Sequence, residues 1–102
     1  TENTKSKVAP LSYIGDLEMA KQRLLAIVVQ LPRTVVVSND ENYLHVTQTS
    51  LVFRFVDDIE FLFDDVAKLI HIRSASRTGY LDFGVNRKRV INIRTLFDHS
   101  SK

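Results

Sequence analysis

Apolar residues in the first third of the chain recur at the spacing of an α-helix. Between Asp16 and Pro32 they stand three or four positions apart, at Leu17, Ala20, Leu24, Val28 and Leu31. This spacing places them on one face of a helix. Asp16 is suited to cap the start of that helix, and Pro32 disfavours a helical conformation at the residue before it. The pattern predicts one amphipathic helix over 16–31, about four turns long.

The next segment has the pattern of a β-hairpin. Residues 34–37 are β-branched throughout, residues 43–49 alternate, and Ser-Asn-Asp-Glu-Asn lies between them at 38–42. β-branched and alternating residues favour strands, and the polar residues between them favour a turn. The two segments are therefore predicted to pair.

Apolar residues then occupy odd positions from Leu51 to Phe63, and only Asp57 breaks the alternation. We interpret Val56-Asp57-Asp58 as a turn or a bulge. A reversal of the chain near Thr49–Ser50 is the alternative, and the sequence does not decide between the two.

A second hairpin is predicted between the strand ending at Phe63 and a last strand over 69–74. A four-residue loop over 64–67 sets Phe63 opposite Lys68 and brings the apolar residues of both strands to one face. The predicted pairs on that face are Phe61–Ile70 and Ile59–Ile72, and those on the other face are Glu60–His71 and Asp58–Arg73. Shifting the register by one residue would set Ile59 opposite Arg73, a poorer match.

The final element is predicted to be a helix that begins near Asn86, a good capping residue, and buries Val90, Ile93 and Phe97. Short connections between strands favour an antiparallel sheet. The order of elements therefore predicts an α+β fold. We expect a two-layer sandwich, with an N-terminal and a C-terminal helix on one face of a sheet of about four strands. A flexible N-terminus over 1–9, a single domain over 10–99 and a tail over 100–102 complete the expected organisation.

The amino-acid composition excludes several classes of protein but does not indicate a particular reaction. The 102 residues are 44% apolar and include no cysteine, which allows one domain with its own core and excludes disulfides and thiol chemistry. The net charge of +2 is too small to indicate a nucleic-acid partner by itself. The longest apolar run, Leu24 to Val29, is too short to span a bilayer. Because the chain begins at Thr1, we expect a processed or trimmed start, and an upstream export signal or anchor is not excluded.

Charge is distributed unevenly along the chain. Residues 57–65 carry five acids and no base, whereas residues 73–94 carry six bases and one acid. If Asn86 caps the last helix, Arg87, Lys88 and Arg89 occupy its first three positions, at the positive end of the helix dipole. Each such charge is disfavoured by about 0.3–1 kcal/mol without a partner. The free backbone N–H groups there also need an acceptor. The pattern predicts a negatively charged group at this helix end.

That negative charge has two possible sources. In the structural interpretation it is internal, and Asp57, Asp58, Glu60 or Asp82 forms an ion-pair network with the arginines. In the functional interpretation it is a small anion such as a phosphate, a carboxylate or a lipid head group, or else the acidic surface of a partner. The predicted binding residues are Arg73, Ser74, Ser76, Arg77, Asn86, Arg87 and Arg89. Both interpretations can hold together, because acids can orient arginines that a ligand uses.

Other chemistries are less well supported by the sequence. Asp57, Asp58, Glu60 and His71 offer hard-metal ligands, but a cross-strand salt bridge and a surface acid patch explain them more simply. Ser74 and Ser76 lack the setting of a nucleophile, and Gly79 and Gly84 fit no phosphate-binding loop. Nucleic-acid binding is not favoured, since only Tyr80 and Phe83 interleave with the bases. We therefore expect no metal, cofactor or catalytic residue. The alternatives are an enzyme using Asp57, Asp58 or Glu60 as acid–base, and a protein-interaction module.

Three segments, residues 55–61, 70–80 and 82–90, resemble the domain-of-unknown-function 1499 family of bacterial and plant proteins. The motif residues of that family map here onto Asp57, Asp58, Glu60, Arg73, Ser74, Ser76, Arg77, Gly79, Asp82, Gly84, Asn86, Arg87 and Arg89. Leu81 stands where the family has a serine and Ile91 where it has a glutamate, which removes one possible counter-charge for the arginines. The resemblance implies no established activity. It implies a bacterial cell-envelope location, with the protein exported or membrane-anchored.

Overall fold

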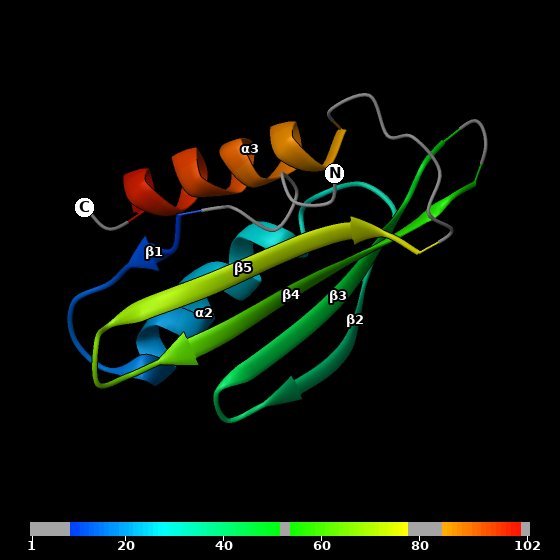
Figure 1. The fold of residues 1–102 in the computed structure, drawn as a ribbon. Coiled ribbons are helices and arrows are strands. Elements are labelled where there is room, and N and C mark those ends of the chain that lie inside the picture. The colour runs from blue at the N-terminus through cyan, green and yellow to red at the C-terminus, as the bar shows by residue number, and fades with distance from the viewer. Residues whose placement is uncertain (1–8, 52–53, 78–84, 101–102) are drawn as a thin grey trace.

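The structure, a computed structural model, describes residues 9–51, 54–77 and 85–100. The elements follow one another in the order β1 (Leu11–Ser12), α2 (Leu17–Val28), β2 (Thr34–Asp40), β3 (Tyr43–Thr49), β4 (Val56–Asp64), β5 (Leu69–Ser76) and α3 (Val85–Ser100) (Figure 1).

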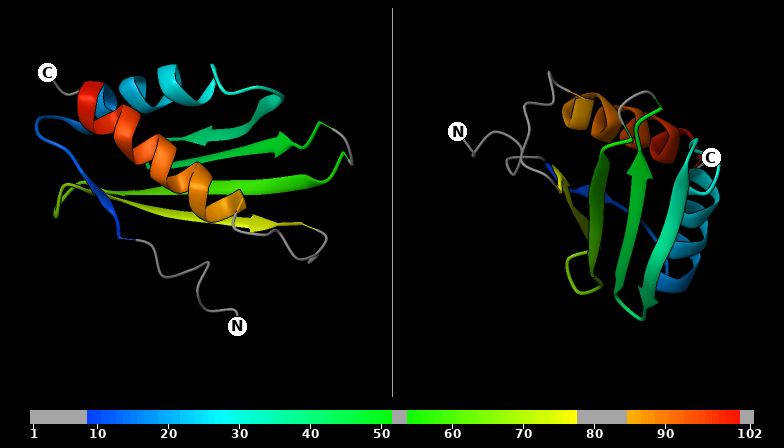
Figure 2. Two further views of the ribbon diagram at one scale, coloured as in Figure 1. Left: turned by 90° about the horizontal axis from the view of Figure 1, so that it is seen from above. Right: turned by 90° about the vertical axis from the view of Figure 1, so that its right-hand side faces the viewer.

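The strands form one antiparallel sheet in the order β1-β5-β4-β3-β2. From above, α3 runs obliquely across the strands (Figure 2). The predicted α+β fold is confirmed. The sheet has five strands rather than about four, because the two-residue β1 also joins it by pairing with the start of β5. So short a strand leaves no alternation to recognise in the sequence.

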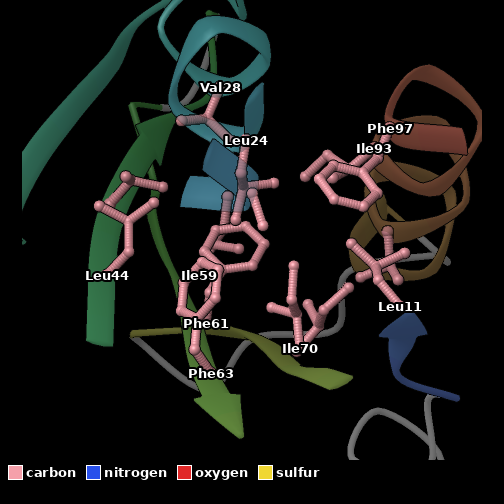
Figure 3. Close-up of a cluster of buried hydrophobic side chains, with 14 of the residues drawn as sticks. Leu11, Leu24, Val28, Leu44, Ile59, Phe61, Phe63, Ile70, Ile93 and Phe97 are labelled. Carbon is pink, nitrogen blue, oxygen red and sulfur yellow. The ribbon is translucent and has the colours of Figure 1, made fainter. Parts of the chain in front are cut away.

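One face of the sheet and both helices share a single core. The alternating residues of β3, β4 and β5 that point to this face are buried together with Ala20, Leu24 and Val28 of α2 and Val90, Ile93 and Phe97 of α3. Figure 3 shows the side chains of both helices converging on those of the strands. We call this the inner face of the sheet and the opposite one the outer face.

The predicted first helix is present, and Asp16 caps it by accepting a hydrogen bond from the backbone N–H of Met19 at 2.8 Å. The helix ends at Val28 rather than Leu31, and backbone bonds of a turn continue to Leu31. The Arg23 guanidinium lies 4.0 Å from the ring centroid of Phe97 and donates to its carbonyl at 2.9 Å, which joins α2 to α3.

The predicted first hairpin is present with longer strands. β2 continues to Asp40, so the turn shrinks to Glu41 and Asn42. The chain next reverses after β3, where the Ser50 N–H donates to the Phe55 carbonyl at 2.9 Å. The turn or bulge predicted at Val56-Asp57-Asp58 is wrong, because β4 runs straight through these residues. Asp57 keeps its inward place in the alternation, since a buried partner compensates its charge.

The predicted register of the second hairpin is wrong by two residues. Ile59 pairs with Ser74 and Phe61 with Ile72, and Glu60 rather than Asp58 faces Arg73. The loop consists of residues 65–68, because Asp64 pairs with Leu69 and its carboxylate accepts from the backbone N–H groups of Val66 and Ala67. A shift of two preserves the inward or outward direction of every side chain. The predicted face assignments therefore survive the wrong pairing.

Asn86 is not the cap of the last helix. α3 begins at Val85, and Asn86 lies inside its first turn with 3% of its surface exposed. The predicted stripe of Val90, Ile93 and Phe97 is buried as expected.

Candidate binding site at the start of α3

The sheet separates the predicted site residues onto its two faces. Ser74 and Ser76 of β5 point to the inner face, whereas Arg73 and Arg77 point to the outer face, because side chains alternate along a strand. Ser74 contacts Asn86 and Arg89 of α3 on the inner side. The seven predicted residues therefore do not line one pocket.

The inner cluster is built around Arg89, whose side chain lies between α3 and the sheet. Its Nη2 donates to Oδ2 of Asp57 at 2.8 Å, and its Nε donates to Oε1 of Gln48 at 2.5 Å. Its Nη1 donates to Oδ1 of Asn86 at 2.5 Å and to Oγ of Ser74 at 3.1 Å. The Ser74 hydroxyl also donates to the Asn86 side chain. All three nitrogens of the guanidinium thus have acceptors.

The inner cluster supplies the internal counter-charge that the sequence required for Arg89. The side chains of Arg89 and Asp57 are only 9% and 4% exposed. Gln48 lies on β3, Asp57 on β4 and Ser74 on β5, so one arginine ties the first turns of α3 to three strands. A buried pair of this kind needs hydrogen bonds on its remaining groups, and the amides and the hydroxyl provide them.

The outer cluster consists of His45, Asp58 and Arg77. Asp58 Oδ1 lies 2.8 Å from Nε2 of His45 and 2.7 Å from Nη2 of Arg77, whose Nε also donates to Oδ2 at 3.1 Å. The hydrogen bonds from Arg77, assisted by His45, hold the pKa of Asp58 below its usual value. The same carboxylate raises the pKa of Arg77.

A second outer pair lies beside this cluster. Arg73 Nη1 donates to Oε2 of Glu60 at 3.0 Å, with the arginine side chain 63% exposed. Burial raises the pKa of Tyr43, and the charge of Glu60 adds to that effect. The predicted pairing of Asp58 with Arg73 is wrong, because the true register gives each acid a different arginine.

Arg87 and Lys88 are both exposed in the first turn of α3, and no partner for either is found among the described residues. Asp82, predicted as a supporting acid, lies outside the described residues. His71 is exposed on the outer face opposite Leu62, on the other side of the sheet from Asp57. Across the described ranges, no group of three or more histidine, aspartate or glutamate side chains could hold a metal ion.

Sequence reasoning missed Gln48 and His45. Both follow from the alternation of β3, in which Leu44, Val46 and Gln48 share the inner face and His45 points outward. A prediction of how β3 pairs with β4 would have found them, since Gln48 is opposite Asp57. The sequence did not decide where the chain reverses between these two strands, so it gave no basis for that pairing.

Charge is polarised along the strands. β3 and β5 end where β2 and β4 begin, and α3 starts at the same end (Figure 1). The basic end, as we call it, carries Arg33, Arg54, Arg77, Arg87 and Lys88 against Asp57 and Asp58 at the start of β4. At the other end, Asp16, Glu18, Glu41 and Asp65 line an open pocket of about 630 Å³. We call this the acidic end.

A comparison with known protein families identifies the family of this chain. Residues 1–97 match the family described as a protein of unknown function, DUF1499. The chain belongs to this family. No match is found among curated proteins or among solved structures. Eight of the motif residues lie in three separate groups: Asp57, Ser74, Asn86 and Arg89 in the inner cluster, Asp58 and Arg77 in the outer cluster, and Glu60 and Arg73 in their own pair. Within the described part of the chain, neither helix is long and apolar enough to cross a membrane.

Proposed function

We propose that this DUF1499 domain is a non-enzymatic binding or accessory domain that holds an anionic group at its basic end. The observation that carries the proposal is the contrast within one turn of α3. Arg89 turns inward to Asp57, whereas Arg87 and Lys88 stay exposed. Two solvent-facing cations at the positive end of a 16-residue helix disfavour the helix unless an anion lies near them.

The three predicted acid–base candidates support binding rather than catalysis. Asp57, Asp58 and Glu60 each form an ion pair with an arginine. A general base is most effective when its pKa lies near the working pH. The lowered pKa of Asp58 moves it away from that range. We therefore do not propose an enzyme.

The predicted binding residues have different roles in this proposal. Arg87 contacts the anion, with Lys88 beside it and Arg77 on the same end of the sheet. Arg89, Ser74 and Asn86 position the helix start, and Arg73 and Ser76 have no direct part. A phosphate, a carboxylate and a lipid head group all offer the required charge. A location in the bacterial cell envelope, implied by the family resemblance, belongs to the same proposal.

The first test follows thermal stability during titration with phosphate, citrate or vesicles of anionic lipid. A ligand with a dissociation constant of about 1 mM, present at about 10 mM, stabilises the folded state by about 1.4 kcal/mol. For a domain of this size such a change raises Tm by several degrees. Absence of any shift with all three probes would contradict the proposal.

The second test compares Arg87→Gln with Arg73→Gln. Both variants remove one exposed charge, but only the first removes it from the basic end. We expect Arg87→Gln to abolish the ligand-induced shift while leaving the stability of the free protein unchanged or slightly higher. Arg73→Gln should keep the shift. Equal shifts in the two variants would show that the anion binds elsewhere.

A further inference from the structure

The edge of the sheet formed by β2 is open. β2 is the terminal strand in the order β1-β5-β4-β3-β2, and β3 is its only neighbour among the described strands. Within residues 9–51, 54–77 and 85–100, no strand pairs with the other side of its seven residues, so backbone N–H and C=O groups on that side are available for pairing.

The side chains of β2 favour contact rather than solvent. Val35, Val36 and Val37 are 61%, 37% and 53% exposed, and no charged or proline residue occurs over 34–39. Native edges are usually protected by lysine, proline or bulges. Here only the irregularity between Val36 and Ser38 serves that purpose. A valine-rich strand of this length is suited to pair with another strand.

The charges at the two ends of β2 select the partner. Arg33 precedes the strand at the basic end, and Asp40 and Glu41 close it at the acidic end. If two copies pair antiparallel about the valines, Arg33 of each copy lies within one or two residues of Asp40 and Glu41 of the other. A parallel arrangement would set like charges together. The strand is therefore complementary to itself in the antiparallel direction alone.

We propose that the protein forms a two-fold symmetric dimer through antiparallel pairing of β2 with β2 of a second copy. The pairing joins the two sheets into one continuous sheet and covers the exposed valines. It also sets the basic end of each copy beside the acidic end of the other. The contact uses the same surface on both copies, so the assembly closes at two.

Sedimentation equilibrium from about 10 μM to about 1 mM tests the proposal. We expect a monomer–dimer equilibrium that weakens as salt concentration rises. Val35→Lys should abolish the dimer, because it brings two like charges together at the shared edge. Val66→Lys, the same substitution in the β4–β5 loop at a residue 97% exposed, should leave it unchanged. A monomer throughout, or equal association of the two variants, would overturn the proposal.

A charge exchange tests the direction of pairing. Arg33→Glu alone, and Asp40→Lys with Glu41→Lys, should each lose self-association. A single chain that carries Arg33→Glu, Asp40→Lys and Glu41→Lys together should form the dimer again, because opposite charges then meet at both ends in the antiparallel direction alone. A triple variant that remains monomeric while it retains its folded circular dichroism spectrum would refute antiparallel pairing through β2.

Discussion

The two faces of the sheet hold the same chemical pair in opposite environments. On the inner face Arg89 and Asp57 lie 2.8 Å apart with side chains 9% and 4% exposed. On the outer face Arg77 and Asp58 lie 2.7 Å apart, but the arginine is 53% exposed. The distances are almost equal, so the distance alone does not indicate what either pair contributes to stability.

Solvent exposure determines how much each of the two ion pairs contributes to stability. Water solvates both partners of an exposed pair in the folded and unfolded states alike, so such a pair contributes about 0–1 kcal/mol. A buried charge that loses its partner has no water to replace it, and breaking a buried pair costs about 3–5 kcal/mol. The inner cluster therefore anchors α3, whereas the outer cluster is a surface feature whose loss the fold tolerates.

The largest effect is expected from Arg89→Met. It leaves the Asp57 carboxylate buried without its guanidinium and removes the donor that joins Gln48, Ser74 and Asn86. We expect the free energy of unfolding to fall by about 3–5 kcal/mol, measured by urea denaturation. A loss below about 1 kcal/mol would show that the two faces do not differ as argued.

Removing both charges of the Arg89–Asp57 pair tests whether the loss in Arg89→Met comes from the unpaired carboxylate. Arg89→Met combined with Asp57→Leu replaces the buried pair by apolar side chains, which is often neutral for stability. We expect the double variant to regain most of the stability that Arg89→Met loses, again by urea denaturation. Asp57→Leu alone, which leaves Arg89 buried and unpaired, is the matched control and should be strongly destabilised.

A smaller effect is expected from Asp58→Asn on the outer face. The variant loses the ion pair with Arg77 and the contact with His45, and its unfolding free energy should fall by about 1 kcal/mol. Because the folded-state pKa of Asp58 is lowered, its contribution is present above the unfolded pKa and disappears as pH falls through the folded value. Tm of the parent and of the variant should therefore differ at pH 6 and converge in acid. A constant difference down to pH 2 would contradict this origin.

The smallest effect is expected from Glu60→Gln. Its partner Arg73 is 63% exposed, so water replaces the lost carboxylate and the unfolding free energy should change by less than about 0.5 kcal/mol. Differential scanning calorimetry should show nearly the same Tm as the parent. A loss comparable to that of Asp58→Asn would mean that the contact of Glu60 with Tyr43 also stabilises the fold.

More of the fold than of the candidate site could be predicted from the sequence. Alternation and helical spacing predicted the layers, because they depend only on which face a residue occupies. The two-residue error in the β4–β5 register shows the limit: Phe61 faces inward opposite either Ile70 or Ile72, so hydrophobic pattern cannot separate the two pairings. Lys68 lies inside the loop because the Asp64 carboxylate accepts hydrogen bonds from the backbone N–H groups of Val66 and Ala67. The hydrophobic pattern does not encode these bonds.

The candidate site was harder to predict, because residues that are neighbours in the sequence lie in different surroundings in the structure. Arg73 and Ser74 are adjacent along β5 yet lie on opposite faces, and Arg87 and Arg89 differ in burial although both begin the same helix. Asp57 was assigned to a turn or a bulge because it interrupts the alternation of apolar residues at odd positions. Its partner Arg89 is 32 residues away in sequence, beyond the reach of local pattern.

The pairing of β1 with β5 has a consequence for how the chain folds as it leaves the ribosome. Leu11 is 1% exposed, packed in a core to which Ile70 and Ile93 also belong, and the carbonyls of Ala9 and Pro10 accept from Arg94 of α3. None of these neighbours exists until most of the chain has been synthesised. β1 is synthesised before the other strands and helices described here, yet it is among the last of them to be fixed in place, and closure of the sandwich waits for α3.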